Sequence, residues 1–212
     1  MLKIDHLLWA VPDLHAGIAY FEQLTGIEAA EGGSHPGRGT RNALLSFGNG
    51  QYIELLGPDP EQDVDNLPND FGRAIKSLPS AGLFTFAMGC IDMTALAASA
   101  QALALPFRGP VASSRRQLDG TTIHWRVCHT DGTPFGRYLP FYIDWLETPH
   151  PSVTVPGGLQ LLDFDVMHPQ GDELAALYQR LGVGVRVRRG DRPGMRAVIQ
   201  AGGKEIILSS VG

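Results

Sequence analysis

The order of secondary-structure signals recurs three times along this 212-residue chain. Apolar strand patterns open at residues 2–11, 82–90 and 158–169, and an amphipathic helical pattern follows each of them after an aspartate or proline. Shorter strand patterns separated by glycine-containing turns come after each helix. The recurrence predicts an α+β fold of repeated βαβββ modules, none of which can bury its sheet without a neighbour.

The same recurrence predicts how the chain divides. We expect a first module at residues 1–58, a second at 82–148 and a third at 157–212. Residues 59–81 then form a linker or lid between the first two modules, because they carry no strand pattern of their own. The third module can pair within the chain or with another copy, so a homodimer is one of the arrangements that the sequence allows.

Superposing the modules assigns equivalent positions in them. The first strands are aligned at the helix breaks and the last strands by their apolar patterns. The equivalent positions are His6, Thr85 and Asp163 in the first strands, and Glu54, Asp144 and Ile207 in the last strands. The third module therefore has no His/Glu pair and is degenerate. We expect it to cover a sheet edge or to complete a second surface.

Charge argues against large anionic partners. The net charge of -5 gives no electrostatic reason to bind nucleic acid or an anionic membrane. Four arginines are close together near the C-terminus, where a solvated edge is the simpler interpretation and a small-anion site the less favoured one. They are Arg186, Arg188, Arg189 and Arg192. The expected partner is a small molecule.

Two cysteines, Cys90 and Cys128, are too few and too far apart for a disulfide framework or a CxxC zinc site. Buried free thiols are the expected state. The chain begins with a strand pattern and has neither a leader-like segment nor an apolar run long enough to cross a bilayer. A cytoplasmic location is the expectation.

Residues 4–26 and 35–60 resemble the opening of the glyoxalase-like domain family, and LPFYIDW at 139–145 resembles its later proline-aromatic strand. That family belongs to the vicinal oxygen chelate (glyoxalase/bleomycin resistance/extradiol dioxygenase) superfamily. The resemblance covers roughly the first 170 residues. It implies paired βαβββ modules whose curved mixed sheets surround a central cavity. It also implies one metal ligand from the first strand and another from the last strand of each module.

Residue by residue, the resemblance assigns His6 and Glu54 to the two ligand positions of the first module. In the second module Asp144 occupies the last-strand carboxylate position, whereas Thr85 replaces the expected His or Gln. A divalent metal held by His6, Glu54 and Asp144 is the implied cofactor, with waters completing its shell. An oxygen-rich set favours Mn, Fe(II) or Mg, and Ni and Zn are further candidates.

Such a metal would chelate neighbouring substrate oxygens and stabilise an enolate that a base creates, and Glu54 could be ligand or catalytic base. The alternative for His6 is a core histidine bonded to a backbone carbonyl. A lone carboxylate within YIELL is costly to bury, which favours a function for Glu54. For Asp144, simple pairing with a neighbouring element is an equal alternative.

The glycine-rich loop SHPGRGTRN offers polar groups for a substrate carboxylate or phosphate. It lacks the P-loop spacing, and a surface loop with paired arginines is the alternative. Thr85 and three strand aromatics would supply further walls of the pocket, although such aromatics are more often core. The candidate substrate-binding residues are His35, Arg38, Arg41, Asn42, Thr85, Trp125, Phe141 and Trp145.

These features predict a metal-assisted lyase, isomerase or dioxygenase that acts on a small oxygenated or carbonyl-bearing molecule. The alternative is a non-catalytic protein of the same fold that binds or sequesters a small molecule at a degenerate metal site. Fold resemblance alone cannot separate the two.

Overall fold

The computed structural model describes residues 1–67, 71–117, 119–130 and 132–211, so residues 68–70 of the expected linker lie outside the described residues. The first repeat contains β1 (Lys3–Ala10), α1 (Leu14–Thr25), β2 (Ala30–His35), β3 (Thr40–Gly48) and β4 (Gln51–Pro58). The second contains β5 (Gly82–Gly89), α3 (Met93–Ala102), β6 (Arg108–Arg116), β7 (Thr122–His129) and β8 (Phe141–Asp144). The third contains β9 (Leu159–His168), α4 (Gly171–Leu181), β10 (Arg186–Arg189), β11 (Gly194–Ala201) and β12 (Lys204–Ser209). The connecting segments add η1 (Val64–Asn66), α2 (Phe71–Lys76), η2 (Gly136–Tyr138) and η3 (Pro151–Val153).

Helix α1 begins and ends where the sequence predicts. The Asp13 carboxylate caps it by accepting a hydrogen bond from the backbone N–H of Ala16. Gly26 ends it with φ +75°, a left-handed conformation that glycine adopts without steric cost. The buried face of α1 includes Phe21, whose ring centroid lies 5.4 Å from that of Trp9 on β1.

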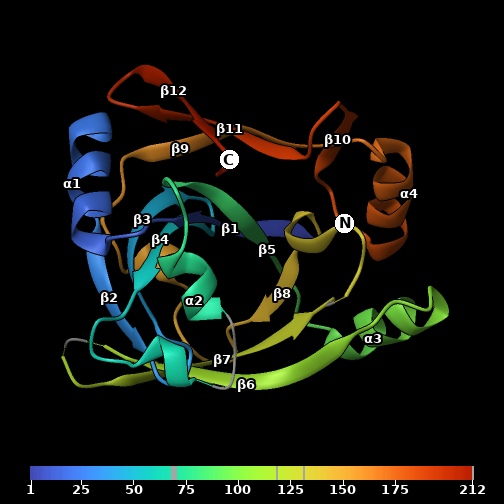
Figure 1. The fold of residues 1–212 in the computed structure, drawn as a ribbon, viewed down its shortest axis with the longest axis horizontal. Coiled ribbons are helices and arrows are strands. Elements are labelled where there is room, and N and C mark those ends of the chain that lie inside the picture. The colour runs from blue at the N-terminus through green and yellow to red at the C-terminus, as the bar shows by residue number, and fades with distance from the viewer. Residues whose placement is uncertain (68–70, 118, 131, 212) are drawn as a thin grey trace.

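The first two repeats share one eight-stranded sheet, in the order β2-β3-β4-β1-β5-β8-β7-β6. Strands β1 and β5 pair antiparallel at its centre, and each lies parallel to the last strand of its own repeat. The sheet curls strongly (Figure 1), so that its two edge strands approach each other: a Cβ added at Gly33 on β2 would lie 2.2 Å from the carbonyl oxygen of Arg116 on β6. The predicted α+β fold of βαβββ modules in a curved mixed sheet is confirmed.

The third repeat has the same element order but a different pairing. Its four strands form their own sheet in the order β10-β9-β11-β12, with β9 parallel to β10. In the first two repeats, by contrast, the first strand lies beside the last. In Figure 1 β9 and β11 pass over β1 and β5, between α1 and α4. An isolated bridge between Leu83 and Ser210 joins the two sheets directly.

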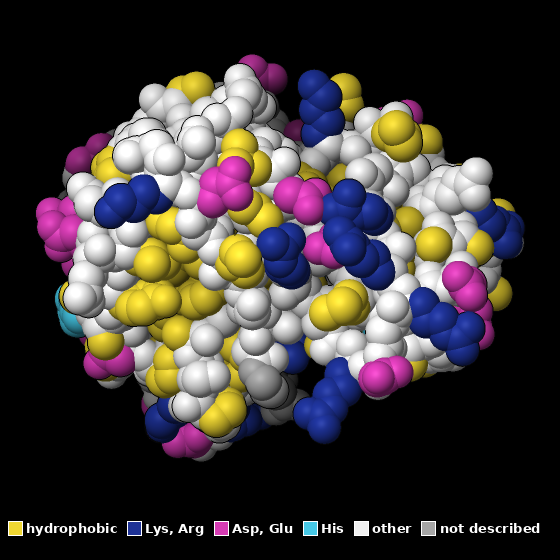
Figure 2. Space-filling model, turned by 90° about the horizontal axis from the view of Figure 1, so that it is seen from above, with side chains coloured by type: hydrophobic (Ala, Val, Ile, Leu, Met, Phe, Trp, Pro, Cys, Tyr) yellow, Lys and Arg dark blue, Asp and Glu magenta, His cyan; other side chains and the backbone are white. Residues whose placement is uncertain are grey.

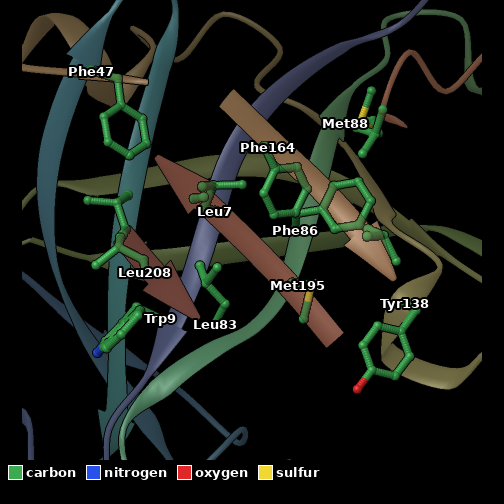
Figure 3. Packing of buried hydrophobic residues seen from close by; sticks show 14 of the residues in the cluster. Leu7, Trp9, Phe47, Leu83, Phe86, Met88, Tyr138, Phe164, Met195 and Leu208 are labelled. Carbon is green, nitrogen blue, oxygen red and sulfur yellow. The ribbon is translucent and has the colours of Figure 1, made fainter. Parts of the chain in front are cut away.

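The main hydrophobic core fills the space between the two sheets. Figure 3 shows side chains from β1 and β5 meeting side chains from β9, β11 and β12. The ring centroids of Phe86 and Phe164 lie 5.0 Å apart within it. The residues of this core include Leu7, Trp9, Leu83, Phe86, Phe164, Met195 and Leu208. Because strand side chains alternate between faces, the convex side of the curled sheet takes these residues and the concave side takes the others.

Helix α2, which lies in the expected linker or lid, packs against the concave side of the curled sheet. Ile75 is fully buried there against Leu8, Ala10 and Leu56. This small apolar cluster occupies one part of the concave face. The rest of that face carries polar and aromatic side chains.

The C-terminal arginines are largely paired. Arg186 bonds to Asp163, and Nε of Arg188 lies 2.7 Å from the Asp165 carboxylate. Figure 2, which views this side of the molecule, shows basic and acidic side chains next to one another. Cys90 and Cys128 are both buried and free. Among the helices of the described residues, none is long and apolar enough to cross a membrane.

Candidate functional site

A cluster of buried polar side chains occupies the concave face of the first repeat. Every member is less than one-tenth exposed. The members are His6 on β1, His35 on β2, Asn42 on β3, Glu54 on β4 and Arg115 on β6. In the parallel β1–β4 pair, His6 lies opposite Tyr52 and so shares a face with Glu54, two residues further along β4. Nε2 of His6 lies 3.6 Å from Oε2 of Glu54.

An irregularity in β1 turns Asp5 toward this cluster. The β1–β5 pairing shifts register between Ile4 and His6, and such bulges re-aim a side chain that strict alternation would send to the other face. As a result Oδ1 of Asp5 lies 2.7 Å from Nδ1 of His6. Its other oxygen accepts from Nε1 of Trp145 at 3.1 Å and pairs with Nε2 of His150 at 3.1 Å.

These contacts set the charge state of Asp5. Burial by itself raises the pKa of the Asp5 carboxyl, but the hydrogen bonds with His150 and His6 outweigh it, and the pKa lies below its ordinary value. An ionised Asp5 can only accept, so the hydrogen of the Asp5–His6 bond is assigned to Nδ1 of His6. The other ring nitrogen, Nε2, is then directed at Glu54.

Asn42 connects two buried charges of opposite sign. Its amide nitrogen donates to Oε1 of Glu54 at 2.5 Å, and its amide oxygen accepts from Nη1 of Arg115 at 2.8 Å. Arg115 belongs to the second repeat and reaches Asn42 because the two edges of the sheet meet. Burial lowers the pKa of the Arg115 guanidinium, whereas the nearby Glu54 charge opposes that change. An arginine remains protonated under such conditions.

His35 is held as a neutral group. Its Nδ1 lies 3.1 Å from the Thr40 hydroxyl, and its Nε2 lies 3.9 Å from Oε1 of Glu54. Burial lowers the pKa of His35 to about 4, more than the neighbouring Glu54 raises it, and the charges of Arg115 and Arg38 lower it further. His35 is therefore a hydrogen-bonding group rather than a cation at neutral pH.

Aromatic rings surround the polar cluster. The Tyr52 ring stacks on His6 with ring centroids 4.5 Å apart, and the Phe141 and His6 rings are T-shaped with centroids 5.4 Å apart. The ring centroid of Trp125 lies 6.3 Å from that of His35 and 5.4 Å from that of Trp145. The first repeat thus supplies most of the polar part of the concave face, to which the second repeat adds Arg115, and the second repeat supplies most of the aromatic part.

The structure brings together most of the residues singled out from the sequence. Those that meet around Glu54 are His6, His35, Asn42, Trp125, Phe141 and Trp145. Arg38 lies nearby, with Nη2 3.3 Å from the Ser113 hydroxyl. Thr85 shares the concave face, but its hydroxyl donates to the carbonyl of Arg137. Arg41 precedes Asn42 on β3 and therefore points to the opposite face, away from the cluster.

Asp144 does not join the cluster, contrary to the expected role as a metal ligand. Its Oδ2 pairs with Nη2 of Arg126 at 2.5 Å. On β8 it shares the face of Tyr142, which belongs to the convex core, whereas Phe141 contacts His6 on the concave side. Strand β8 lies beside β5 with Phe141 opposite Ala87, so Thr85 and Phe141 correspond in register to His6 and Glu54. Alignment by apolar pattern was displaced by three residues.

Several site residues carried little signal in the sequence. Tyr52 could have been found, because it lies two residues before Glu54 on the same strand face. Asp5 could be assigned to the site only from the structure, because the bulge in β1 turns it toward the cluster. Arg115 and His150 come from segments distant in sequence, and only the closure of the sheet and the path of the connector place them here.

The donor set does not match the expected metal site. Among the described residues, no three His, Cys, Asp or Glu side chains form a group that could hold a metal ion. The first repeat offers Nε2 of His6, Nε2 of His35 and the Glu54 carboxylate, whose Oε1 already accepts from Asn42. The corresponding positions of the second repeat are Thr85 and Phe141. Catalytic zinc sites use three protein ligands that converge on the ion, and the described His, Cys, Asp and Glu side chains form no such group.

Paired βαβββ modules in one curled sheet, with a His/Glu pair on its concave face, define a protein of the vicinal oxygen chelate class. The glyoxalase-like domain family matches residues 4–182, and the chain belongs to that family. Among curated protein sequences, none matches the chain.

One solved structure shows the same fold at low sequence identity, and others are similar to part of this chain. A hypothetical protein from Staphylococcus aureus is 15% identical with a TM-score of 0.69, and the match covers 100% of this chain and 89% of that one. Methylmalonyl-CoA epimerase from Streptomyces coelicolor, in complex with 2-nitronate-propionyl-CoA, is 21% identical (TM-score 0.48, 66% and 95% coverage). The epimerase from Mycobacterium tuberculosis is 19% identical (TM-score 0.48, 71% and 91% coverage).

Proposed function

We propose that this protein is a glyoxalase-type lyase or isomerase that acts on a small carbonyl-bearing molecule, with Glu54 as the base. One observation carries the proposal. The buried Glu54 carboxylate is fixed through Oε1 by Asn42 and presents Oε2 to Nε2 of His6 at 3.6 Å. Removing a proton from a carbon beside a carbonyl needs a positioned carboxylate in a site with little water.

The proton transfer can be followed through the described side chains. Oε2 of Glu54 takes the proton, the C–H bond breaks, and its electron pair moves into the carbonyl to give an enolate. Protonated Glu54 then passes the proton to Nε2 of His6, whose lone pair is free because the hydrogen lies on Nδ1. Asp5 stabilises the resulting imidazolium. Return of the proton to the opposite face of the same carbon inverts that carbon and completes an isomerisation. In an elimination the enolate electrons form a C=C bond, the bond from the next carbon to the leaving group breaks, and the leaving group takes the proton.

No step of this scheme passes through a metal, because the donor set is incomplete. The dioxygenase chemistry that the sequence left open needs a redox metal, for which the facial triad of two histidines and one carboxylate is the usual frame. His6, His35 and Glu54 are the residue types of such a frame, but the described residues form no group of three that could hold a metal ion. A lyase or isomerase is therefore the better supported part of the expectation.

A non-catalytic binding protein is the second candidate. It is favoured by Thr85 and Phe141, which occupy the second-repeat positions that correspond in strand register to His6 and Glu54. It is also favoured by the aromatic rings around the cluster, which would hold a ligand without any proton transfer. The two candidates differ in whether bound molecules exchange protons.

Hydrogen–deuterium exchange distinguishes them. The purified protein would be incubated in D2O with hydroxyacetone, pyruvate and 2-oxobutyrate, and exchange beside the carbonyl followed by proton NMR. We expect exchange above the solvent rate for at least one compound. In the Glu54→Gln variant the exchange rate should fall by about 10²- to 10⁴-fold, which is the usual contribution of a general base. Glu28→Gln, which changes an exposed glutamate in the same repeat, is the matched control.

Two results would count against the enzyme. If the wild type and Glu54→Gln exchange at the same rate, Glu54 is not the base. If compounds bind without any exchange, the binding protein becomes the better description.

A further inference from the structure

We propose that Arg115 forms a carboxylate-binding subsite beside Glu54, and that the molecule taken by the site is a small oxo acid. The inference deepens the proposed function and rests on it for the role of Glu54. It starts from a buried cation whose hydrogen-bonding capacity is largely unused.

Arg115 is 5% exposed, and within the described chain it makes no ion pair. Among the described residues, its side chain makes one hydrogen bond, to the neutral amide oxygen of Asn42. A buried guanidinium without a carboxylate in contact is costly, because the charge has lost its water and gained no direct counter-ion. A ligand that brings a negative charge would remove that cost.

The free edge of the guanidinium suits a carboxylate. Nη1 donates to Asn42, whereas Nε is buried without a hydrogen-bond partner among the described residues. Nε and Nη2 lie on the side of the group away from Nη1, and together they form the two-pronged donor that binds both oxygens of a carboxylate. Because Asn42 occupies Nη1, this edge is left for a ligand.

The position of Arg115 places that ligand next to the base. The guanidinium is close enough to alter the pKa values of His35 and Tyr52, and Glu54 in turn acts on the pKa of Arg115. Asn42 spans the gap between Arg115 and Glu54. A carboxylate on Arg115 would therefore leave the adjoining carbonyl and its neighbouring carbon near Glu54.

The backbone of β2 leaves room for Arg115. A Cβ added at Gly32 would lie 2.2 Å from Nη1 of Arg115 and 2.3 Å from the amide oxygen of Asn42. Any side chain at this position would displace the pair. Gly32 and the closure of the sheet thus together allow Arg115 of the second repeat to contact Asn42 of the first repeat.

The test compares an acid with its uncharged ester. Binding of 2-oxobutyrate and of methyl 2-oxobutyrate would be measured by titration calorimetry and ligand-observed NMR on the wild type and three variants. Arg115→Gln removes the charge, and Arg115→Lys keeps it without the two-pronged geometry. Arg116→Gln is the matched control, since Arg116 is the exposed neighbour on the same strand.

We expect the acid to bind at least about tenfold more tightly than the ester to the wild type. Arg115→Gln should abolish this preference, Arg115→Lys should retain part of it, and Arg116→Gln should leave it unchanged. The proposal is overturned if acid and ester bind equally, if neither binds at millimolar concentration, or if Arg115→Gln retains the preference. The wild-type comparison of acid and ester keeps the test decisive even where a variant fails to fold.

Glu54→Gln separates this inference from the proposed function. A carboxylate held by Arg115 should still bind this variant, and more tightly, because a nearby negative charge has gone. If the wild type binds the acid but shows no proton exchange, the Arg115 subsite is supported and the proposed enzymatic function is contradicted. If the ester exchanges its protons as fast as the acid does, the proposed enzyme stands and the Arg115 subsite is contradicted.

Discussion

Asp5 and His6 are neighbours in the chain, yet their side chains share a 2.7 Å hydrogen bond on the same side of the sheet. The register shift in β1 makes this contact possible. It fixes the hydrogen on Nδ1 of His6 and leaves Nε2 directed at Glu54, as the proposed proton transfer requires. Carboxylates that orient a metal-ligating histidine commonly change activity by about 10- to 100-fold when removed, and we expect an effect of this size at His6.

Asp5→Asn should therefore slow proton exchange by about 10- to 100-fold and shift its pH profile, because an amide cannot stabilise the imidazolium as a carboxylate does. The pH profile separates this role from simple loss of packing. His150→Gln, which removes only the outer hydrogen bond to Asp5, should have a smaller effect. An Asp5→Asn protein with the wild-type rate and pH profile would show that Asp5 does not act through His6.

His35 should make the free energy of unfolding depend on pH. Its pKa is about 4 in the folded protein and near 6.5 in the unfolded chain, so between these values the unfolded state binds more protons. The contribution of neutral His35 is complete above pH 6.5 and is lost as the pH falls toward 4, by at most about 3 kcal/mol. Urea unfolding from pH 4 to 7 would measure it.

The His35→Gln variant should flatten that slope, since glutamine does not titrate. His15→Gln, on the exposed side of α1, is the matched control and should keep the wild-type slope. The difference between the variants isolates His35 from other buried groups, such as His168, whose pKa burial also lowers. Equal slopes for His35→Gln and the wild type would contradict the assignment.

The register of β5 and β8 predicts how to complete a metal site. Thr85→His combined with Phe141→Glu would place a second His/Glu pair opposite His6 and Glu54. We expect the double variant to bind a divalent metal at least about tenfold more tightly than the wild type, which corresponds to about 1.4 kcal/mol. Titration calorimetry with Ni²⁺, Zn²⁺ and Mn²⁺, together with elemental analysis, would measure the change.

Adding His6→Ala to the double variant is the control, because it removes one ligand of the completed site. Its affinity should return to the wild-type level. If the double variant gains nothing, the concave side chains of the two repeats do not converge as the register implies.

Gly32→Ala should disrupt the Arg115 subsite by steric overlap, without removing any of its polar groups. The new Cβ would lie 2.2 Å from Nη1 of Arg115, so the Arg115–Asn42 contact must open. Overpacking of this kind costs about 1–3 kcal/mol of stability, and we expect the preference for acid over ester to fall with it. Gly157→Ala is the matched control, because a Cβ there meets no atom within 4 Å. Unchanged acid binding in Gly32→Ala would argue against the subsite.

The sequence by itself determined the repeated βαβββ order and two central residues of the site. Cap residues such as Asp13 and breaks such as Gly26 are local signals, so the residues around them are enough to predict where a helix begins and ends. His6 and Glu54 could also be identified, because each lies on a strand whose pattern and family resemblance agree. The carboxylate within YIELL needed a polar partner, and Asn42 provides one from the singled-out SHPGRGTRN segment, whose end belongs to β3.

Only the tertiary structure decided which other side chains reach them. Strand pairing set the face of Asp144, which bonds to Arg126 on the convex side, and a register shift turned Asp5 inward. Closure of the curled sheet brought Arg115 to Asn42 across 73 residues of sequence. Register, bulges and edge closure depend on the summed packing of distant strands, and no local pattern of residues encodes that sum.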